Sequence, residues 1–173
     1  MIYLFFAFSL ATPALGSELG AWEGLWKGSC QLNPAYLGTT EFDTSLEIEP
    51  LPGGHGHRWV AISEQSGSLP RQVRNYELLP IDVSNGHYVI DEKNGLMLDM
   101  FLTGQLMQSP FVINGNLVNA TYVLLDSNKM LMQLPTFDFT SSRRTCLKGN
   151  PSLCSESFPI KARQSCELKR VLN

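Results

Sequence analysis

The stretch His87-Tyr-Val-Ile-Asp-Glu-Lys-Asn-Gly-Leu-Met-Leu-Asp-Met-Phe-Leu102 contains two apolar runs separated by an Asn-Gly pair. Asn94-Gly95 is the pair that a two-residue type I′ turn favours, because both central residues of that turn have a positive φ. The β-branched and aromatic residues on either side favour extended chain. We therefore predict that residues 88–90 and 96–102 are antiparallel neighbours in a β-hairpin.

The sequence on both sides of this hairpin repeats the alternation of strand and turn. Residues 41–49 place Phe42, Leu46 and Ile48 on one face and acidic residues on the other, as in a half-buried strand. No window shows the 3.6-residue apolar period of a helix. Because consecutive hairpins that close on themselves leave no exposed sheet edge, the sequence predicts an all-β, antiparallel up-and-down β-barrel of about 8–10 strands. The other strands are expected at residues 57–64, 71–79, 111–113, 117–125, 129–134 and 160–171.

The composition indicates a globular chain. Its 173 residues are 43% hydrophobic and 17% charged, with a net charge of −3, so the apolar fraction suffices for a packed core. There is no long run of lysine or arginine, and we therefore expect no nucleic acid partner. No apolar run reaches the ~20 residues of a membrane-spanning helix, so we expect no membrane span.

The first sixteen residues predict export. Residues 1–16 are apolar and uncharged, and Ala14 and Gly16 are placed for signal-peptidase cleavage. We interpret residues 1–16 as a signal peptide and residues 17–173 as a single barrel domain, which makes the protein secreted or periplasmic. The alternative is an N-terminal apolar helix or membrane anchor, but this run is shorter than the ~20 residues that cross a bilayer.

The cysteines agree with export. Cys30, Cys146, Cys154 and Cys166 make an even number, so two disulfides are expected among three pairings. Their spacing does not suit a zinc site, and we predict no metal. Residues 146–154 are rich in turn formers and resemble a loop closed by its own disulfide, which leaves Cys30 for Cys166. That bridge would join the first strand to the last, as a closed barrel allows. The alternative is four free thiols in a cytosolic protein.

The beginning of the predicted domain resembles a known protein family. Gly20-Ala21-Trp22, followed by Glu23-Gly24-Leu25-Trp26-Lys27-Gly28, is similar to the Gly-x-Trp opening of lipocalins and related calycin barrels. In that superfamily the Trp plugs the closed end of the barrel, and a basic residue of the last strand covers it. The resemblance therefore implies a structural plug made of Gly20, Trp22 and a basic residue, Arg170 or its neighbour Lys169. Stacking of an arginine on an indole ring would stabilise that end of the barrel.

Two departures from the lipocalin pattern limit the resemblance. The cysteine loop occupies the place of the helix that precedes the last strand in lipocalins, and residues 119–122, Asn-Ala-Thr-Tyr, stand where those proteins have a Thr-Asp-Tyr motif. The resemblance thus extends to a lipocalin-like calycin barrel rather than to a true lipocalin.

Several residues are candidates for lining a ligand cavity inside such a barrel. Trp26 shares a strand face with Trp22 and either lines the interior above the plug or belongs to the core. The other candidates are large side chains in the expected strands, several of which carry a polar atom that needs a partner when buried: Phe42, Leu46, Trp59, Tyr76, Tyr88, Phe101, Tyr122 and Met132. The same residue types build ordinary cores, and small barrels either fill with side chains or enclose one ligand.

The sequence contains no recognisable catalytic motif. It has no Gly-x-Ser-x-Gly elbow, no His-Glu-x-x-His helix and no glycine-rich phosphate loop. We assign no catalytic residue and no cofactor, and favour a binding function over an enzymatic one. Our first hypothesis is a secreted or periplasmic binding protein that holds a small hydrophobic or amphipathic ligand in the barrel. The alternative is a filled barrel that acts through its surface loops on a protein or an envelope component, with residues 51–57 or 147–159 as contact elements.

Overall fold

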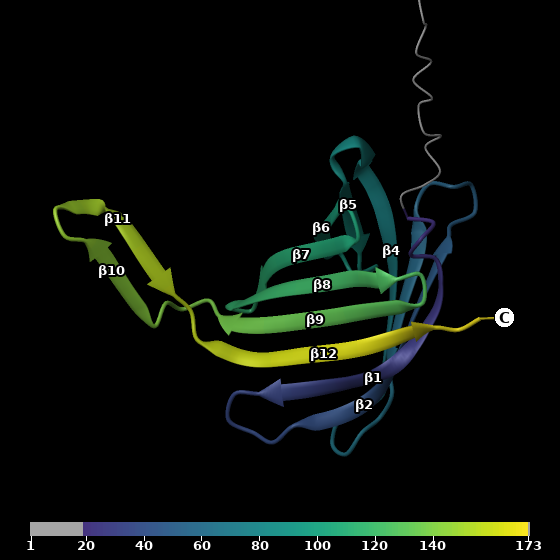
Figure 1. The fold of residues 1–173 in the computed structure, drawn as a ribbon, viewed down its shortest axis with the longest axis horizontal. Coiled ribbons are helices and arrows are strands. Elements are labelled where there is room, and N and C mark those ends of the chain that lie inside the picture. The colour runs from purple at the N-terminus through teal and green to yellow at the C-terminus, as the bar shows by residue number, and fades with distance from the viewer. Residues whose placement is uncertain (1–18, 173) are drawn as a thin grey trace, which may run out of the picture.

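The computed structural model describes residues 19–172 of the chain (Figure 1). The predicted signal peptide, residues 1–16, lies outside these described residues. Within residues 19–172 there are twelve β-strands and one short 3-10 helix, and ten of the strands close into an antiparallel barrel. The predicted all-β barrel of about 8–10 strands is confirmed.

The described elements, in chain order, are β1 (Gly24–Pro34), β2 (Thr40–Pro50), β3 (His57–Ser63), β4 (Gln72–Asp82), the 3-10 helix η1 (Val83–Asn85), β5 (His87–Asp91), β6 (Met97–Thr103), β7 (Leu106–Ile113), β8 (Asn116–Asp126), β9 (Lys129–Asp138), β10 (Arg143–Leu147), β11 (Asn150–Ser157) and β12 (Ile160–Arg170).

The barrel is a meander that its last strand closes. Strands β1 to β9 pair in chain order, and β12 lies between β9 and β1. Sequential pairing follows from the short connections, which bring neighbouring strands together. Strands β10 and β11, which lie between β9 and β12 in the sequence, form a separate two-stranded ribbon that projects from the barrel (Figure 1).

Strand β2 shows how the sequence pattern fixes the inner face of the barrel. Phe42, Leu46 and Ile48 are buried, as their alternation predicts, whereas Glu41 and Glu49 are exposed. Each fully buried aliphatic side chain of this kind contributes roughly 1.5–3 kcal/mol to folding. The same alternation on the other strands builds one continuous core inside the barrel.

Strands β1 and β12 are joined by a disulfide on the inner face of the barrel. Cys30 and Cys166 face each other in the register, with Cα atoms 4.0 Å apart, and both are fully buried. The close approach of the two strands also requires a glycine. A Cβ atom added at Gly28 would lie 1.8 Å from the carbonyl oxygen of Glu167. The predicted bridge between the first and last strands is confirmed.

The hairpin of β5 and β6 is present, but its turn differs from the prediction. Asp91 pairs with Met97, so the connection is longer than two residues. The positive φ angles belong to Lys93 and Gly95, at 58° and 96°, and not to Asn94. The carboxylate of Asp91 accepts a hydrogen bond from the backbone N–H of Lys93 at 2.7 Å, which supports the longer loop.

A two-residue turn forms instead at another Asn-Gly pair, Asn114-Gly115. Ile113 pairs with Asn116 across the β7–β8 hairpin, and Asn114 and Gly115 have φ angles of 48° and 71°. Both central residues thus adopt the left-handed conformation of a type I′ turn. The Asn-Gly dipeptide is the same in both hairpins and does not determine which of them has the two-residue turn. The hairpin of β5 and β6 differs in having Asp91, whose carboxylate accepts the hydrogen bond from Lys93.

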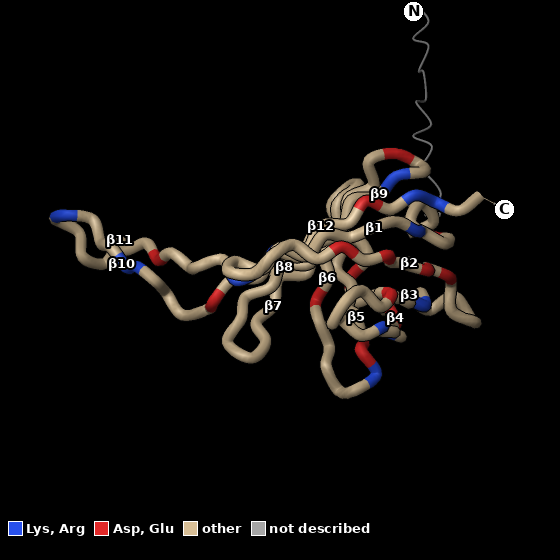
Figure 2. The backbone as a smooth tube through the Cα atoms, turned by 90° about the horizontal axis from the view of Figure 1, so that it is seen from below, with Lys and Arg blue, Asp and Glu red and all other residues tan. Residues whose placement is uncertain are grey.

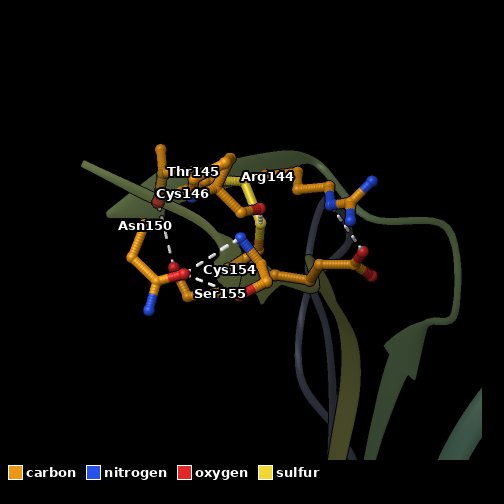
Figure 3. The surroundings of a disulfide bond; sticks show 9 residues. Arg144, Thr145, Cys146, Asn150, Cys154 and Ser155 are labelled. Carbon is orange, nitrogen blue, oxygen red and sulfur yellow. Dashed lines mark hydrogen bonds and ion pairs between the residues drawn. A yellow bond between two sulfur atoms is a disulfide. The ribbon is translucent and has the colours of Figure 1, made fainter. Parts of the chain in front are cut away.

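Residues 143–157, which we call the disulfide arm, form a two-stranded ribbon, and the loop predicted for residues 146–154 is the end of this ribbon. Cys146 and Cys154 face each other across β10 and β11 and form the predicted disulfide. Beside it the hydroxyl oxygens of Thr145 and Ser155 lie 2.9 Å apart (Figure 3). The arm extends away from the barrel in a second view as well (Figure 2), and nearly all of its strand residues are exposed.

Candidate functional site

One end of the barrel is closed by two tryptophans and an arginine. The guanidinium carbon of Arg170 lies 4.2 Å from the ring centroid of Trp26, and the indole N–H of Trp26 donates to the carbonyl oxygen of Trp22 at 2.9 Å. Trp22 and Trp26 are both buried. The two tryptophans and Arg170 therefore pack together at this end of the barrel.

The partner of Arg170 differs from the one that the resemblance implied. The ring beneath Arg170 is that of Trp26 and not that of Trp22, because the β1–β12 register places Trp26 directly opposite Arg170. Trp22 precedes β1 and packs into the core from a turn, in which Gly20 is exposed. Lys169, the other basic candidate, is exposed. Trp26 is thus part of the closed end, as its core alternative predicted, and does not line a cavity.

A histidine and a glutamate reinforce the closed end. His57 at the start of β3 is buried, and its Nε2 lies 3.1 Å from Oε1 of Glu23. This contact connects the segment before β1 to β3 on another part of the wall. This buried contact gives a structural role to His57, which directly follows the glycine-rich turn of residues 53–56.

A cavity of about 270 Å³ occupies the other half of the barrel interior. Its wall comes from β1 to β4, β8, β9 and β12, and the β3–β4 connection contributes Leu69 and Pro70 to its rim. Exposed residues such as Glu64 and Gln72 belong to the lining, so the cavity reaches the surface. The lining residues are Leu32, Phe42, Thr44, Ser45, Leu46, Trp59, Ala61, Ser63, Glu64, Leu69, Pro70, Gln72, Arg74, Tyr76, Tyr122, Met132, Leu134, Gln164 and Leu168.

Aromatic side chains form much of the inner wall. The rings of Trp59 and Tyr122 meet edge to face, with centroids 5.1 Å apart. Burial raises the pKa of Tyr122 to about 12, while the nearby charge of Arg74 and a hydrogen bond with Trp59 act in the opposite direction. Burial also raises the pKa of Tyr76. Both tyrosines are therefore neutral at physiological pH and place hydroxyl groups in a largely apolar wall.

Six of the nine predicted lining residues lie in the cavity wall. They are Phe42, Leu46, Trp59, Tyr76, Tyr122 and Met132. Trp26 belongs to the closed end instead. Tyr88 is only 3% exposed and belongs to the packed core, outside the cavity lining.

Phe101 is placed on the outside of the barrel, contrary to the prediction. It is 42% exposed and stacks on His87, with ring centroids 4.9 Å apart. Leu98, Met100 and Leu102 form the uniformly apolar face of β6. Phe101 shares the other face with Asp99 and Thr103, so the alternation favoured an outward position that the prediction did not follow. The residues that β6 turns inward are Met100 and Leu102, which are buried.

The sequence reasoning missed the polar residues of the cavity, above all Arg74 and Gln164. A signal for Arg74 was present. In the predicted strand of residues 71–79, Arg74 has the same parity as Tyr76, which places both side chains on one face. The prediction nevertheless left Arg74 out, because a basic residue in a strand is expected to face solvent. The same kind of signal was present for Gln164, which shares its strand face with the apolar residues of the predicted strand at residues 160–171, Ile160, Ala162, Cys166 and Leu168.

Residues 19–172 contain no cluster of three or more His, Cys, Asp or Glu side chains suited to a metal ion. The same residues include no helix long and apolar enough to cross a membrane.

Comparison with known proteins finds similarity of structure without similarity of sequence. No protein-family model matches the chain, and no curated protein matches it significantly. Among solved structures, the S-type phycobiliprotein lyase CpeS from Guillardia theta superposes with a TM-score of 0.61 at 5% identity, covering 88% of this chain and 90% of that chain.

A second solved structure is a protein of unknown function from the DUF3598 family of Nostoc punctiforme. Its TM-score is 0.59 at 11% identity, and the match covers 88% of this chain but 49% of that chain. This chain thus spans about half the length of the DUF3598 protein. At such identities the similarity shows the fold alone: the chain is a closed ten-stranded lipocalin-like β-barrel that resembles CpeS and the DUF3598 protein.

Proposed function

We propose that the protein is a secreted or periplasmic binding protein that holds a small amphipathic molecule inside its barrel. The observation that carries this proposal is the cavity of about 270 Å³, which reaches the surface at one end of a barrel sealed at the other. Ligand sites of proteins are commonly concave and mainly apolar, with a few polar groups that orient the ligand. The wall of aromatic residues with two neutral tyrosine hydroxyls has this character.

Two disulfides support the proposed location outside the cytoplasm. Such bonds form and persist in oxidising compartments, and Cys30–Cys166 and Cys146–Cys154 include all four cysteines of the chain. The similarity in fold to a phycobiliprotein lyase is compatible with a small ligand in the barrel, but it does not identify one.

The test is native mass spectrometry of the mature protein from its own host, before and after denaturation. We expect a small co-purifying mass that is lost on unfolding. Ala61 lines the cavity on β3, whereas Val73 on the neighbouring strand is half exposed and outside the lining. Ala61→Phe should abolish the bound mass and the matched control Val73→Phe should retain it. A bare chain that also fails to take up octanoate, 1-octanol and octylamine would overturn the proposal.

A second candidate function, contact with a macromolecule, is favoured by the disulfide arm. Its strands pair only with each other, and Leu147 and Leu153 on it are 57% and 59% exposed. Strand β11 of the arm lies within residues 147–159, one of the two segments expected to make contacts if the barrel were filled. Replacing residues 142–157 with two glycines separates the two functions, because ligand uptake should survive this deletion if the cavity is the working site.

A further inference from the structure

Arg74 differs from the other charged residues around the cavity. Among the described residues that line the cavity, Arg74 is the only basic one and Glu64 the only acidic one. Arg74 lies on β4 directly opposite Ala61 of β3, and its charge acts on both cavity tyrosines, Tyr76 and Tyr122. The guanidinium is therefore close to the two hydroxyl groups of the inner wall.

The guanidinium of Arg74 has no carboxylate partner within ion-pair distance in the described part of the chain. Its side chain donates to the amide oxygen of Gln72 at 3.3 Å and forms a hydrogen bond with the hydroxyl of Tyr76, and neither partner is charged. By contrast, Arg58 on the outside of the barrel lies 2.7 Å from two glutamates, and Arg71 lies 3.1 Å from Glu64. The acidic residue of the lining is thus already paired, whereas the basic one is not.

The other acidic group near this position also has a partner. Glu92 forms a side-chain hydrogen bond with Tyr76, but it does not line the cavity, and its Oε2 accepts a hydrogen bond from the side chain of Asn94 at 3.2 Å. An anion that enters the cavity would meet one unpaired guanidinium, and the two nearby carboxylates would each be held by another residue.

The lining changes from polar to apolar along the cavity. Gln72, Arg74 and Glu64 are exposed, whereas Leu46, Trp59 and Met132 are buried. A ligand that matches both regions has a polar head and an apolar body. The head that an unpaired guanidinium recognises best is a carboxylate or a similar oxyanion, which can accept two parallel N–H hydrogen bonds.

We propose that the cavity selects an anionic amphiphile, with its carboxylate on Arg74 and its apolar body directed toward Trp59 and Met132. This inference rests on the proposed binding function and deepens it by naming the ligand class. With a volume share of about 30 Å³ per water molecule, a cavity of about 270 Å³ holds roughly nine small groups of that size. A medium-length acyl chain is therefore an appropriate probe.

The experiment compares three eight-carbon probes by isothermal titration calorimetry on the mature protein at pH 7.5. Octanoate, 1-octanol and octylamine share the same chain and differ in the charge of the head. We expect octanoate to bind about tenfold or more tightly than 1-octanol, and octylamine to bind most weakly. Arg74→Gln should reduce the affinity for octanoate about tenfold and change that for 1-octanol less than twofold.

Two more variants separate recognition from a general effect of charge or of folding. Arg58→Gln removes the same charge from the outer face and should leave all three affinities unchanged. Arg74→Lys retains the charge but loses the two-pronged geometry and should give an intermediate affinity for octanoate. If Arg74→Gln fails to fold, the octanoate affinity of Arg74→Lys provides the test in its place.

The outcomes distinguish this inference from the proposed function. Equal affinities of the wild type for octanoate and 1-octanol would overturn the anionic ligand class but not the binding function. The same holds if Arg74→Gln loses affinity for octanoate and for 1-octanol by the same factor. Tightest binding of octylamine would also overturn the class. No binding of any probe, together with a bare mass from the native host, would overturn both.

Discussion

The guanidinium of Arg170 lies over the ring of Trp26, with its carbon 4.2 Å from the ring centroid. The same side chain donates to the carbonyl oxygens of Ser127 at 2.8 Å, Ala21 at 2.6 Å and Glu23. One residue near the end of the chain thus connects the last strand, the β8–β9 turn and the segment that enters β1. The closed end of the barrel depends on this contact.

Replacing Arg170 should therefore destabilise the barrel. Arg170→Met loses the stacking on Trp26, worth about 0.5–2 kcal/mol, and three hydrogen bonds worth about 1 kcal/mol each, so we expect a decrease of roughly 3–5 kcal/mol in the free energy of unfolding. Urea unfolding followed by far-ultraviolet circular dichroism measures it. The control Lys169→Met alters an exposed neighbour and should change stability by less than about 0.5 kcal/mol. Equal stabilities of the two variants would contradict the role assigned to Arg170.

The two disulfides should differ in their effect on the barrel. Cys30 and Cys166 are 136 residues apart, and a loop of that length corresponds to about 5 kcal/mol in the chain-entropy account. Cys146 and Cys154 are 8 residues apart, in an arm whose strands do not pair with the barrel. We expect the double variant Cys30→Ala, Cys166→Ala to lower the melting temperature strongly. The double variant Cys146→Ala, Cys154→Ala should shift it by only a few degrees. Calorimetry compares the two, and the reverse order would show that the arm supports the barrel.

Gly28 should tolerate no side chain. Its absent Cβ would lie 1.8 Å from the carbonyl oxygen of Glu167, which belongs to the backbone of β12 and has little room to move. We expect Gly28→Ala to cost about 3 kcal/mol or more, because the strands that close the barrel must separate. Gly38 has nothing within 4 Å of its added Cβ, so Gly38→Ala is the matched control. A Gly28→Ala protein that unfolds at the wild-type urea concentration would refute this account of the β1–β12 contact.

Tyr122 should make the protein less stable at high pH. The folded state holds the pKa of Tyr122 at about 12, and the unfolded chain has a tyrosine pKa of about 10. The stabilising contribution is complete below about pH 10 and is lost as pH rises through 12, because the unfolded state releases its proton first. Between pH 9 and pH 11.5 we expect wild type to lose about 2 kcal/mol more stability than Tyr122→Phe. Identical pH profiles for both proteins would show that Tyr122 titrates in the folded state as it does in the unfolded chain.

The sequence predicted the fold well wherever one face of a strand is apolar and the other polar. In β2, Phe42, Leu46 and Ile48 lie inward as their alternation indicates, because a slip of one residue would bury the glutamates. In β6, Phe101 shares the outer face with Asp99 and Thr103, and its inward prediction, which rested on its size, was wrong. The face of a strand residue is thus indicated by the alternation of its neighbours and not by its own size.

Cysteine spacing predicted both disulfides, since a short turn-rich loop between Cys146 and Cys154 left only Cys30 and Cys166 to pair. The all-β class, the hairpin order and the identity of most aromatic wall residues were likewise determined by local pattern. Local pattern is sufficient for these features because strand periodicity and turn chemistry depend on residues that are only a few positions apart.

Only the tertiary structure decided which tryptophan lies under Arg170 and which groups of the cavity wall face one another. Trp26 meets Arg170 through the register of β1 and β12, strands that lie at opposite ends of the sequence. Arg74 meets Tyr122 across the interior from a strand that does not pair with its own. Such contacts depend on how the sheet closes and where its inner faces converge, and no local property of the sequence specifies either.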